Sequence, residues 1–154
     1  VLSTLHTNDA PSAVTRLLDL GVPPFLLSST LLGVMAQRLV RTLCPHCKQP
    51  GEAPDDETWR AITSPWRAEK PAQVMAPVGC VECRMTGYRG RIGLYEVMLM
   101  TPAIRKLVTA EADDAAIRDQ AYKDGMKPLR VSGATKVAAG WTTADEVVKV
   151  VPLG

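Results

Sequence analysis

Apolar residues recur at helical spacing early in the chain. Between Ala13 and Leu18 they lie on one face and polar residues lie on the other, which is typical of an amphipathic helix. Asp9 suits the N-cap position, and Pro11 falls in the first turn, where the N–H that proline lacks would have no helical partner anyway. We therefore predict a helix at this point and, before it, a short strand over residues 1–6.

The spacing is less uniform in the next stretch. A second helix is predicted over residues 25–32. Residues 34–43 fit a helix or a strand, and their β-branched, alternating side chains favour a strand. Asp55 or Asp56 can cap a short helix, and residues 92–97 alternate in the way expected of a strand.

The last third of the chain has helical spacing throughout. Helices are predicted over residues 103–110 and 129–139, with another between them that Asp113 or Asp114 caps. Residues 143–146 form a capping box before a final helix. No apolar run reaches the roughly 18 residues that a membrane-spanning helix needs. The pattern predicts an α+β chain with a helical C-terminal bundle.

The only four cysteines of the chain form two Cys-x-x-Cys turns, which we call knuckles. The first contains Cys44 and Cys47, and the second contains Cys80 and Cys83. Two such turns can supply the closed shell of four thiolates that is typical of a structural zinc site. The segment between them is longer than the roughly 15–20 residues of the common zinc ribbon, so it must fold back on itself.

Other interpretations of the cysteines remain open, namely two disulfides, free thiols in the core, or a redox pair. Two disulfides would require an oxidising compartment, and the chain shows no signal-peptide pattern at its start. A redox pair would need only one Cys-x-x-Cys beside a βαβ unit. His46, inside the first knuckle, could replace a cysteine as ligand, and we expect it instead to face solvent or to lie behind the ligands. A closed four-cysteine shell leaves no open coordination position for catalysis.

Candidate chemistry outside the knuckles is sparse. His6 lies where a strand end, a polar loop and a helix N-terminus would meet, which is a common ligand position in α/β domains. Its alternative role is to cap the helix or to satisfy local backbone groups. Arg89 and Arg91 could bind a phosphate or carboxylate, or could be solvated loop charges. A net charge of +2 gives no indication of nucleic-acid binding. The chain contains no phosphate-binding P-loop, nucleophile elbow or His-Glu-x-x-His motif.

Several stretches nevertheless match one family in order. They are STLHTNDA (residues 3–10), QRLVRTLCPHCK (37–48), GCVEC (79–83) and TGYRGRIGLYE (86–96), followed by Gly125, Gly133, Gly140, Thr142, Thr143 and Glu146. They resemble the His box, the approach to the metal domain, the second knuckle, the exit strand and the helical C-terminus of the secretion ATPase superfamily. The resemblance is closest to the type II secretion E protein, with the type IV pilus extension motor as the alternative. Retraction motors lack the tetracysteine insert and fit less well.

This resemblance implies a cytoplasmic, hexameric ATPase at the inner membrane, bound there peripherally through secretion or pilus platform proteins. Its ATP hydrolysis would drive pseudopilus assembly, and thereby protein transport across the bacterial outer membrane. ATP and Mg would bind the full-length protein, zinc would bind the cysteines, and nucleic acid is not an expected partner. By the same resemblance, His6 is the candidate catalytic residue that approaches the γ-phosphate.

The resemblance also implies that the chain is a C-terminal part of such a motor. In the family the phosphate loop, Asp box and Walker B acid precede the His box, so we expect this part alone to be inactive. Residues 1–43 would end a RecA-like ATPase domain, 44–100 would form the tetracysteine subdomain with its exit strand, and 101–154 a helical C-terminal subdomain. A zinc-stabilised protein-interaction module without a direct role in hydrolysis, or a nucleic-acid-binding zinc ribbon, are the competing interpretations.

Overall fold

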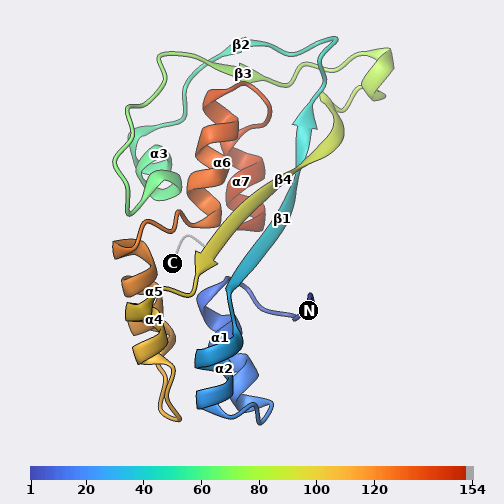
Figure 1. Ribbon diagram of the computed structural model, residues 1–154. Helices are drawn as coiled ribbons and strands as arrows, with labels where there is room; N and C mark the ends of the chain where they lie inside the picture. The colour runs from blue at the N-terminus through green and yellow to red at the C-terminus, as the bar shows by residue number, and fades with distance from the viewer. Residues whose placement is uncertain (152–154) are drawn as a thin grey trace. The chain divides into compact units, whose positions relative to one another are not determined.

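A computed structural model describes residues 1–151 of the chain (Figure 1). Its helices are α1 (Pro11–Asp19), α2 (Pro24–Thr30), α3 (Asp56–Thr63), α4 (Pro102–Leu107), α5 (Asp114–Lys123), α6 (Leu129–Ala138) and α7 (Ala144–Val150). Its strands are β1 (Gly33–Leu43), β2 (Gln49–Gly51), β3 (Val74–Ala76) and β4 (Tyr88–Leu99), with a 3-10 turn, η1 (Val81–Cys83). The predicted mixture of helices and strands is confirmed. Among the described residues, every helix is too short or too polar to cross a lipid bilayer.

Contacts group the chain into two units. Unit 1 contains Val1–Ala36 and Tyr95–Pro128, and unit 2 contains Gln37–Leu94 and the chain from Leu129 onward. Strands β1 and β4 contribute residues to both units. The predicted division into residues 1–43, 44–100 and 101–154 stays a prediction, and its last three residues lie outside the part that the structure describes.

Strands β1 and β4 form an antiparallel pair (Figure 1). The pairing extends beyond both strand ends, because the Cys44 N–H donates to the Gly87 carbonyl and the Met100 N–H donates to the Leu32 carbonyl, both at 3.0 Å. The strand predicted over residues 34–43 is therefore confirmed. Side chains of β4 alternate between the core and solvent from Leu94 to Leu99.

Unit 1 is a small helical core against the inward side chains of the sheet. Helix α1 packs against α5 and α2, and α4 packs against α5 and α2. The buried side chains are almost all aliphatic or Met: Ala10, Ala13, Val14, Leu27, Ala36, Met98, Met100, Ile104, Val108, Ile117, Ala121 and Met126. The amphipathic face of α1 that the sequence predicted is thus the face that is buried.

Unit 2 is built around helix α6, which contacts α3, α7 and β3. Short strands β2 and β3 pair in antiparallel fashion, with Pro50 opposite Met75, so the segment between the knuckles does fold back on itself. Gly133 lets α6 approach α7 closely, because a Cβ atom built at this residue would lie 2.4 Å from Cγ1 of Val147. The side chains buried here include Leu43, Trp59, Ile62, Leu94, Leu129, Val137 and Val147.

Several predicted helix starts are confirmed by their caps. The side chains of Asp55, Asp113 and Thr143 each accept a backbone N–H at the start of α3, α5 and α7 respectively. Two local predictions were wrong. Residues 1–6 form no strand, and Glu146, expected to complete the capping box with Thr143, directs its carboxylate to Arg41 instead. The buried and ionic environment of Glu146 therefore overrides a local sequence signal.

Candidate functional site

The four cysteine sulfurs form one compact cluster in unit 2. Cys44 follows β1, Cys83 ends η1, and all four Sγ atoms lie within 4.8 Å of one another. Sγ separations are 3.9 Å for Cys44 to Cys80, 3.8 Å for Cys47 to Cys83 and 3.8 Å for Cys80 to Cys83. All four cysteines are free, so the structure contains neither of the two disulfides considered from the sequence.

This geometry fits a tetrahedral metal ion. With Zn–S bonds of about 2.3 Å, the edges of a ZnS₄ tetrahedron are about 3.8 Å long, which matches the measured sulfur separations. Backbone N–H groups also point at the sulfurs, as thiolate ligands require: Gly79 donates to Cys47 (3.3 Å), and Gly87 donates to Cys83 (3.2 Å). Cys80 likewise donates its N–H to the Cys83 sulfur (3.2 Å).

The thiols of Cys80 and Cys83, the two cysteines of the second knuckle, differ in how readily they ionise. Burial disfavours the Cys83 thiolate, but backbone N–H groups of Cys80 and Gly87 outweigh it and lower the pKa of Cys83 to about 6. The Cys83 N–H favours the Cys80 thiolate, but desolvation and the surrounding sulfurs raise the pKa of Cys80 to about 11. When one of these neighbouring sulfurs is a thiolate, its negative charge disfavours ionisation of the next. A coordinated metal ion would remove this repulsion and allow all four thiols to lose their protons.

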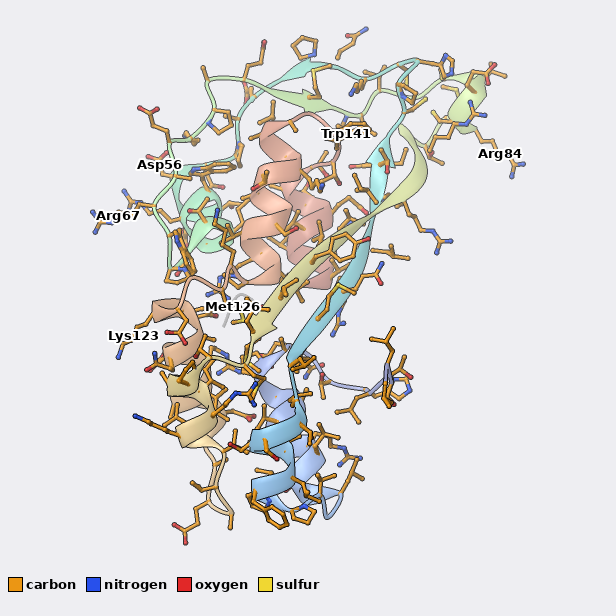
Figure 2. All side chains as sticks on the ribbon, in the orientation of Figure 1. Asp56, Arg67, Arg84, Lys123, Met126 and Trp141 are labelled. Carbon is orange, nitrogen blue, oxygen red and sulfur yellow. The ribbon has the colours of Figure 1, made fainter. Side chains whose placement is uncertain are left out.

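Both knuckles begin with the same turn, in which the N–H of the second cysteine donates to the carbonyl of the first, Cys47 to Cys44 and Cys83 to Cys80. The turns then differ, because Lys48, four residues on, also donates to the Cys44 carbonyl, whereas Met85, five residues on, donates to that of Cys80. The turn after Cys83 requires left-handed backbone conformations, at Arg84 (φ 53°), Met85 (φ 64°) and Gly87 (φ 80°). Figure 2 shows the Arg84 side chain extending away from this turn. At Gly87 a side chain would also collide with Pro77, because a Cβ atom would lie 2.5 Å from the proline Cβ.

His46 does not join the cluster. Its side chain is exposed, as the sequence analysis expected, and the sulfur ligand set is complete without it. Arg89 pairs with Glu82 at 3.2 Å, and both side chains are more than half exposed. Arg91 is exposed as well. These arginines are solvated charges, as one of the two interpretations of the sequence had it, but they lie in strand β4 and not in a loop.

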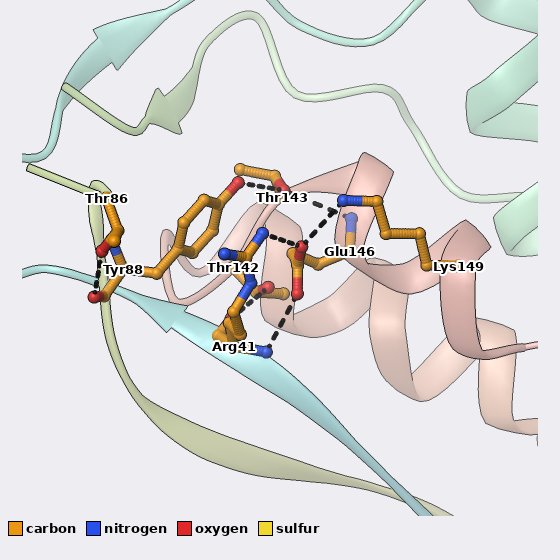
Figure 3. A network of polar contacts seen from close by, with 7 residues as sticks. All are labelled: Arg41, Thr86, Tyr88, Thr142, Thr143, Glu146 and Lys149. Carbon is orange, nitrogen blue, oxygen red and sulfur yellow. Dashed lines mark hydrogen bonds and ion pairs between the residues drawn. The ribbon is translucent and has the colours of Figure 1, made fainter. Parts of the chain in front are cut away.

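A polar network ties the strands beside the knuckles to helix α7 (Figure 3). Arg41 Nη2 lies 2.6 Å from Glu146 Oε1, and the guanidinium lies 4.1 Å from the Tyr88 ring centroid. The Tyr88 hydroxyl is 3.0 Å from Thr143 Oγ1, and Thr142 Oγ1 donates to the Arg41 carbonyl. The strands that carry the knuckles are therefore held by the last helix of the chain.

The second candidate site is the loop of residues 3–10 in unit 1, which we call the His6 loop. His6 itself is exposed. It does not cap α1, because the Asp9 carboxylate does so, with its Oδ1 accepting the Ser12 N–H at 3.0 Å. The N-cap residue of α1 is Ala10, so the prediction that Asp9 is the N-cap was wrong by one residue, although the Asp9 carboxylate still accepts an N–H of the first turn. The capping alternative for His6 is therefore wrong.

Two contacts of the His6 loop were not predicted from the sequence. The Ala10 N–H donates to Glu96 Oε1 at 2.7 Å, and Arg118 Nη2 lies 2.6 Å from Asp9 Oδ2. Burial opposes the Asp9 carboxylate, but its bonds to Ser12 and Arg118 outweigh burial and hold the pKa of Asp9 below its ordinary value. Glu96 could have been found from the sequence, because it shares the inward alternation of Leu94 in β4 and an acid there requires a buried partner.

Comparison with known proteins gives these sites a context. The family profile described as "Type II/IV secretion system protein" matches residues 1–149. The type IV pilus assembly ATPase TfpB of Acinetobacter baylyi is 53% identical over 153 residues, which are 99% of this chain and 26% of that protein. The type II secretion system ATPase E of Vibrio cholerae is 45% identical over 150 residues, 97% of this chain and 29% of that protein. The chain belongs to the type II/IV secretion system protein family.

The family resemblance noted in the sequence is thus confirmed over nearly the whole chain. A third relative, the type IV pilus assembly ATPase PilB of Myxococcus xanthus, is 44% identical over 148 residues, 96% of this chain and 26% of that protein. The chain spans only 26–29% of the length of these three relatives. Both the tetracysteine cluster and the His6 loop lie inside the region that matches the family.

Proposed function

We propose that this chain is a C-terminal part of a motor ATPase that assembles a pilus or pseudopilus. The observation that carries the proposal is the family match over residues 1–149 to proteins named as pilus assembly and secretion ATPases. ATP and Mg would bind residues that precede this region in the longer protein. That protein would act as a cytoplasmic hexamer on inner-membrane platform proteins.

The motor could serve either of two processes, type II protein secretion or type IV pilus extension. The sequence motifs favour the type II secretion motor, with the pilus extension motor as the alternative. The identity of 53% to a pilus assembly ATPase, against 45% to a type II secretion ATPase, favours pilus extension. Deleting the gene for the full-length protein and assaying both surface pili and secreted proteins distinguishes the two roles.

The four cysteines would serve this motor as a structural zinc site. Zinc supplies a closed, redox-inactive S₄ cross-link between the knuckles, with no coordination position left for substrate. Cys44, Cys47, Cys80 and Cys83 would hold the ion, and the N–H donors of Gly79 and Gly87 would stabilise the thiolates. The cross-link would join the two ends of the segment whose helix α3 contributes Trp59 and Ile62 to the core of unit 2.

His6 would be the residue of this chain that contacts the γ-phosphate. Its exposure leaves the imidazole free to meet a ligand, and Asp9 already satisfies the start of α1. His6→Ala in the full-length motor should lower the rate of ATP hydrolysis by about 10–100-fold, as expected for the loss of one transition-state contact. Thermal stability should change little.

The chain contains its own matched control for this experiment. His46 is the only other histidine and is also exposed, so His46→Ala should leave ATP hydrolysis unchanged. A His6→Ala motor with the wild-type rate per folded hexamer would refute the role of His6. The isolated fragment should bind no ATP in calorimetry, and micromolar affinity would contradict the proposal that nucleotide contacts lie mainly upstream.

A further inference from the structure

We infer that Glu96 and Arg118 are positioning residues that fix the His6 loop at the start of α1. The inference rests on the proposed function and deepens it, because it names the groups that place His6. Both residues are distant from the loop in sequence, with Glu96 in β4 and Arg118 in α5. Both nevertheless contact it within unit 1.

Glu96 anchors the loop at Ala10. Glu96 is only 3% exposed, and Ala10 is fully buried. Oε1 of Glu96 accepts the Ala10 N–H at 2.7 Å. The first N–H groups of a helix have no partner within the helix and carry partial positive charge, so a carboxylate stabilises this position. Without it, a buried N–H would be unsatisfied, which is unfavourable enough to move the backbone.

Arg118 anchors the loop one residue earlier, through Asp9. One carboxylate oxygen of Asp9 receives Arg118 Nη2 at 2.6 Å, and the other receives the Ser12 N–H at 3.0 Å. Asp9 thereby joins α5 to α1, and its side chain is only 22% exposed, so solvent screens the ion pair incompletely. Thr15 of α1 also donates to Asp114 of α5, which adds a second connection between these helices.

These anchors matter because His6 lies outside any regular element. Residues 1–7 belong to no helix or strand, so the position of the imidazole depends on where Asp9 and Ala10 are fixed. A displacement of about 1 Å at a reacting group can lower a rate by about 100-fold. Glu96 and Arg118 therefore act through His6 and need not contact nucleotide themselves.

The test uses the full-length motor with Arg118→Met, Arg118→Lys, Glu96→Leu and Glu96→Gln, each alone and with His6→Ala. Arg118→Met and Glu96→Leu should lower kcat about tenfold per folded protein. Arg118→Lys keeps a donor for Asp9, and Glu96→Gln keeps an acceptor for the Ala10 N–H. Both variants should therefore retain most of the wild-type kcat. In the His6→Ala background, Arg118→Met should cause no further loss, because both changes remove the same contact.

Arg41→Met is the matched control, since it removes an arginine–carboxylate pair of the same 2.6 Å length in unit 2. An equal fall in kcat for Arg41→Met, or additive losses with His6→Ala, would overturn the inference. If Glu96→Leu does not fold, the kcat of Arg118→Met still tests the inference, because Arg118 is partly exposed and its substitution should be tolerated. If His6→Ala itself leaves kcat unchanged, the proposed role of His6 fails. If His6→Ala lowers kcat but Arg118→Met does not, only the positioning inference fails.

Discussion

Glu146 and Arg41 bind each other twice, although they are far apart in the sequence. Oε1 of Glu146 lies 2.6 Å from the Arg41 guanidinium, and Oε2 accepts the Arg41 backbone N–H at 3.2 Å. The side chain of Glu146 is only 6% exposed, whereas that of Arg41 is 48% exposed. One buried carboxylate therefore satisfies both a cation and a backbone donor of β1, which connects α7 to the strand that leads into the first knuckle.

The pH dependence of stability should reveal this carboxylate. The hydrogen bond from Arg41 is the main reason that the pKa of Glu146 falls from 4.5 to about 2. Because the folded pKa is the lower one, the unfolded state binds more protons between these values, and stability is lost as pH falls from about 4.5 to about 2. Relative to wild type, Glu146→Gln should be less stable above pH 5 by about 1–3 kcal/mol and should lose less on acidification. Parallel pH dependences in urea unfolding would exclude the effect.

Two ion pairs of equal length should differ in their contribution to stability. Arg41→Met leaves the buried Glu146 charge with the backbone N–H of residue 41 and the largely exposed Lys149 as partners, and should lower the free energy of unfolding by about 2–3 kcal/mol. Lys70 and Asp56 are also 2.6 Å apart, but their side chains are 36% and 73% exposed. Lys70→Met should therefore lower the free energy of unfolding much less than Arg41→Met does. Equal destabilisation of the two variants would contradict this dependence on burial.

Metal removal should loosen unit 2 selectively. The purified chain should contain about one equivalent of zinc, and a chelator or Cys80→Ser should increase amide hydrogen exchange in the knuckles, α6 and α7. Helices α4 and α5 belong to unit 1 and should change less. His46→Ala should retain the metal. Unchanged exchange in unit 2 after complete metal removal would show that the cysteine cluster does not stabilise it.

Gly133→Ala should destabilise the contact of α6 with α7. Alanine favours the helix by about 1 kcal/mol, but its methyl group would overlap Val147, and overpacking costs about 1–3 kcal/mol. We expect a net loss of up to about 2 kcal/mol in thermal or urea unfolding. The double variant Gly133→Ala/Val147→Ala should recover the overlap part of that loss only. A stabilised single variant would mean that the two helices separate easily.

Local patterns predicted most of the helices because each carries its own signal. Asp55 and Asp113 cap as expected, and the strand predicted over residues 92–97 is part of β4, although its Val97 is exposed and Glu96 is buried. The cysteine cluster was predictable for the same reason, since its chemistry is contained in two short turns. Contacts between residues that are far apart in the sequence could not be predicted in this way. Nothing near Glu146 or Arg118 in the sequence indicates the residue that each one binds.

The false strand over residues 1–6 has a related cause. A run of β-prone residues forms a strand only when a neighbouring strand pairs with it, and within the described residues the structure places none there. His6 was therefore located correctly beside the start of a helix, but in an irregular loop. Its surroundings depend on Asp9 and on partners that only the fold brings near.

The position of the cysteine cluster also bears on how the chain folds. Strand β1 ends at Leu43, immediately before the first knuckle, and β4 begins at Tyr88, shortly after the second. An ion held by both knuckles in an otherwise unfolded chain would make the two strands close neighbours and leave the α3 segment as a side loop. Pairing β1 with β4 would then resemble the closing of a short hairpin, and the entropy of closing the long intervening loop would already have been lost when the ion bound.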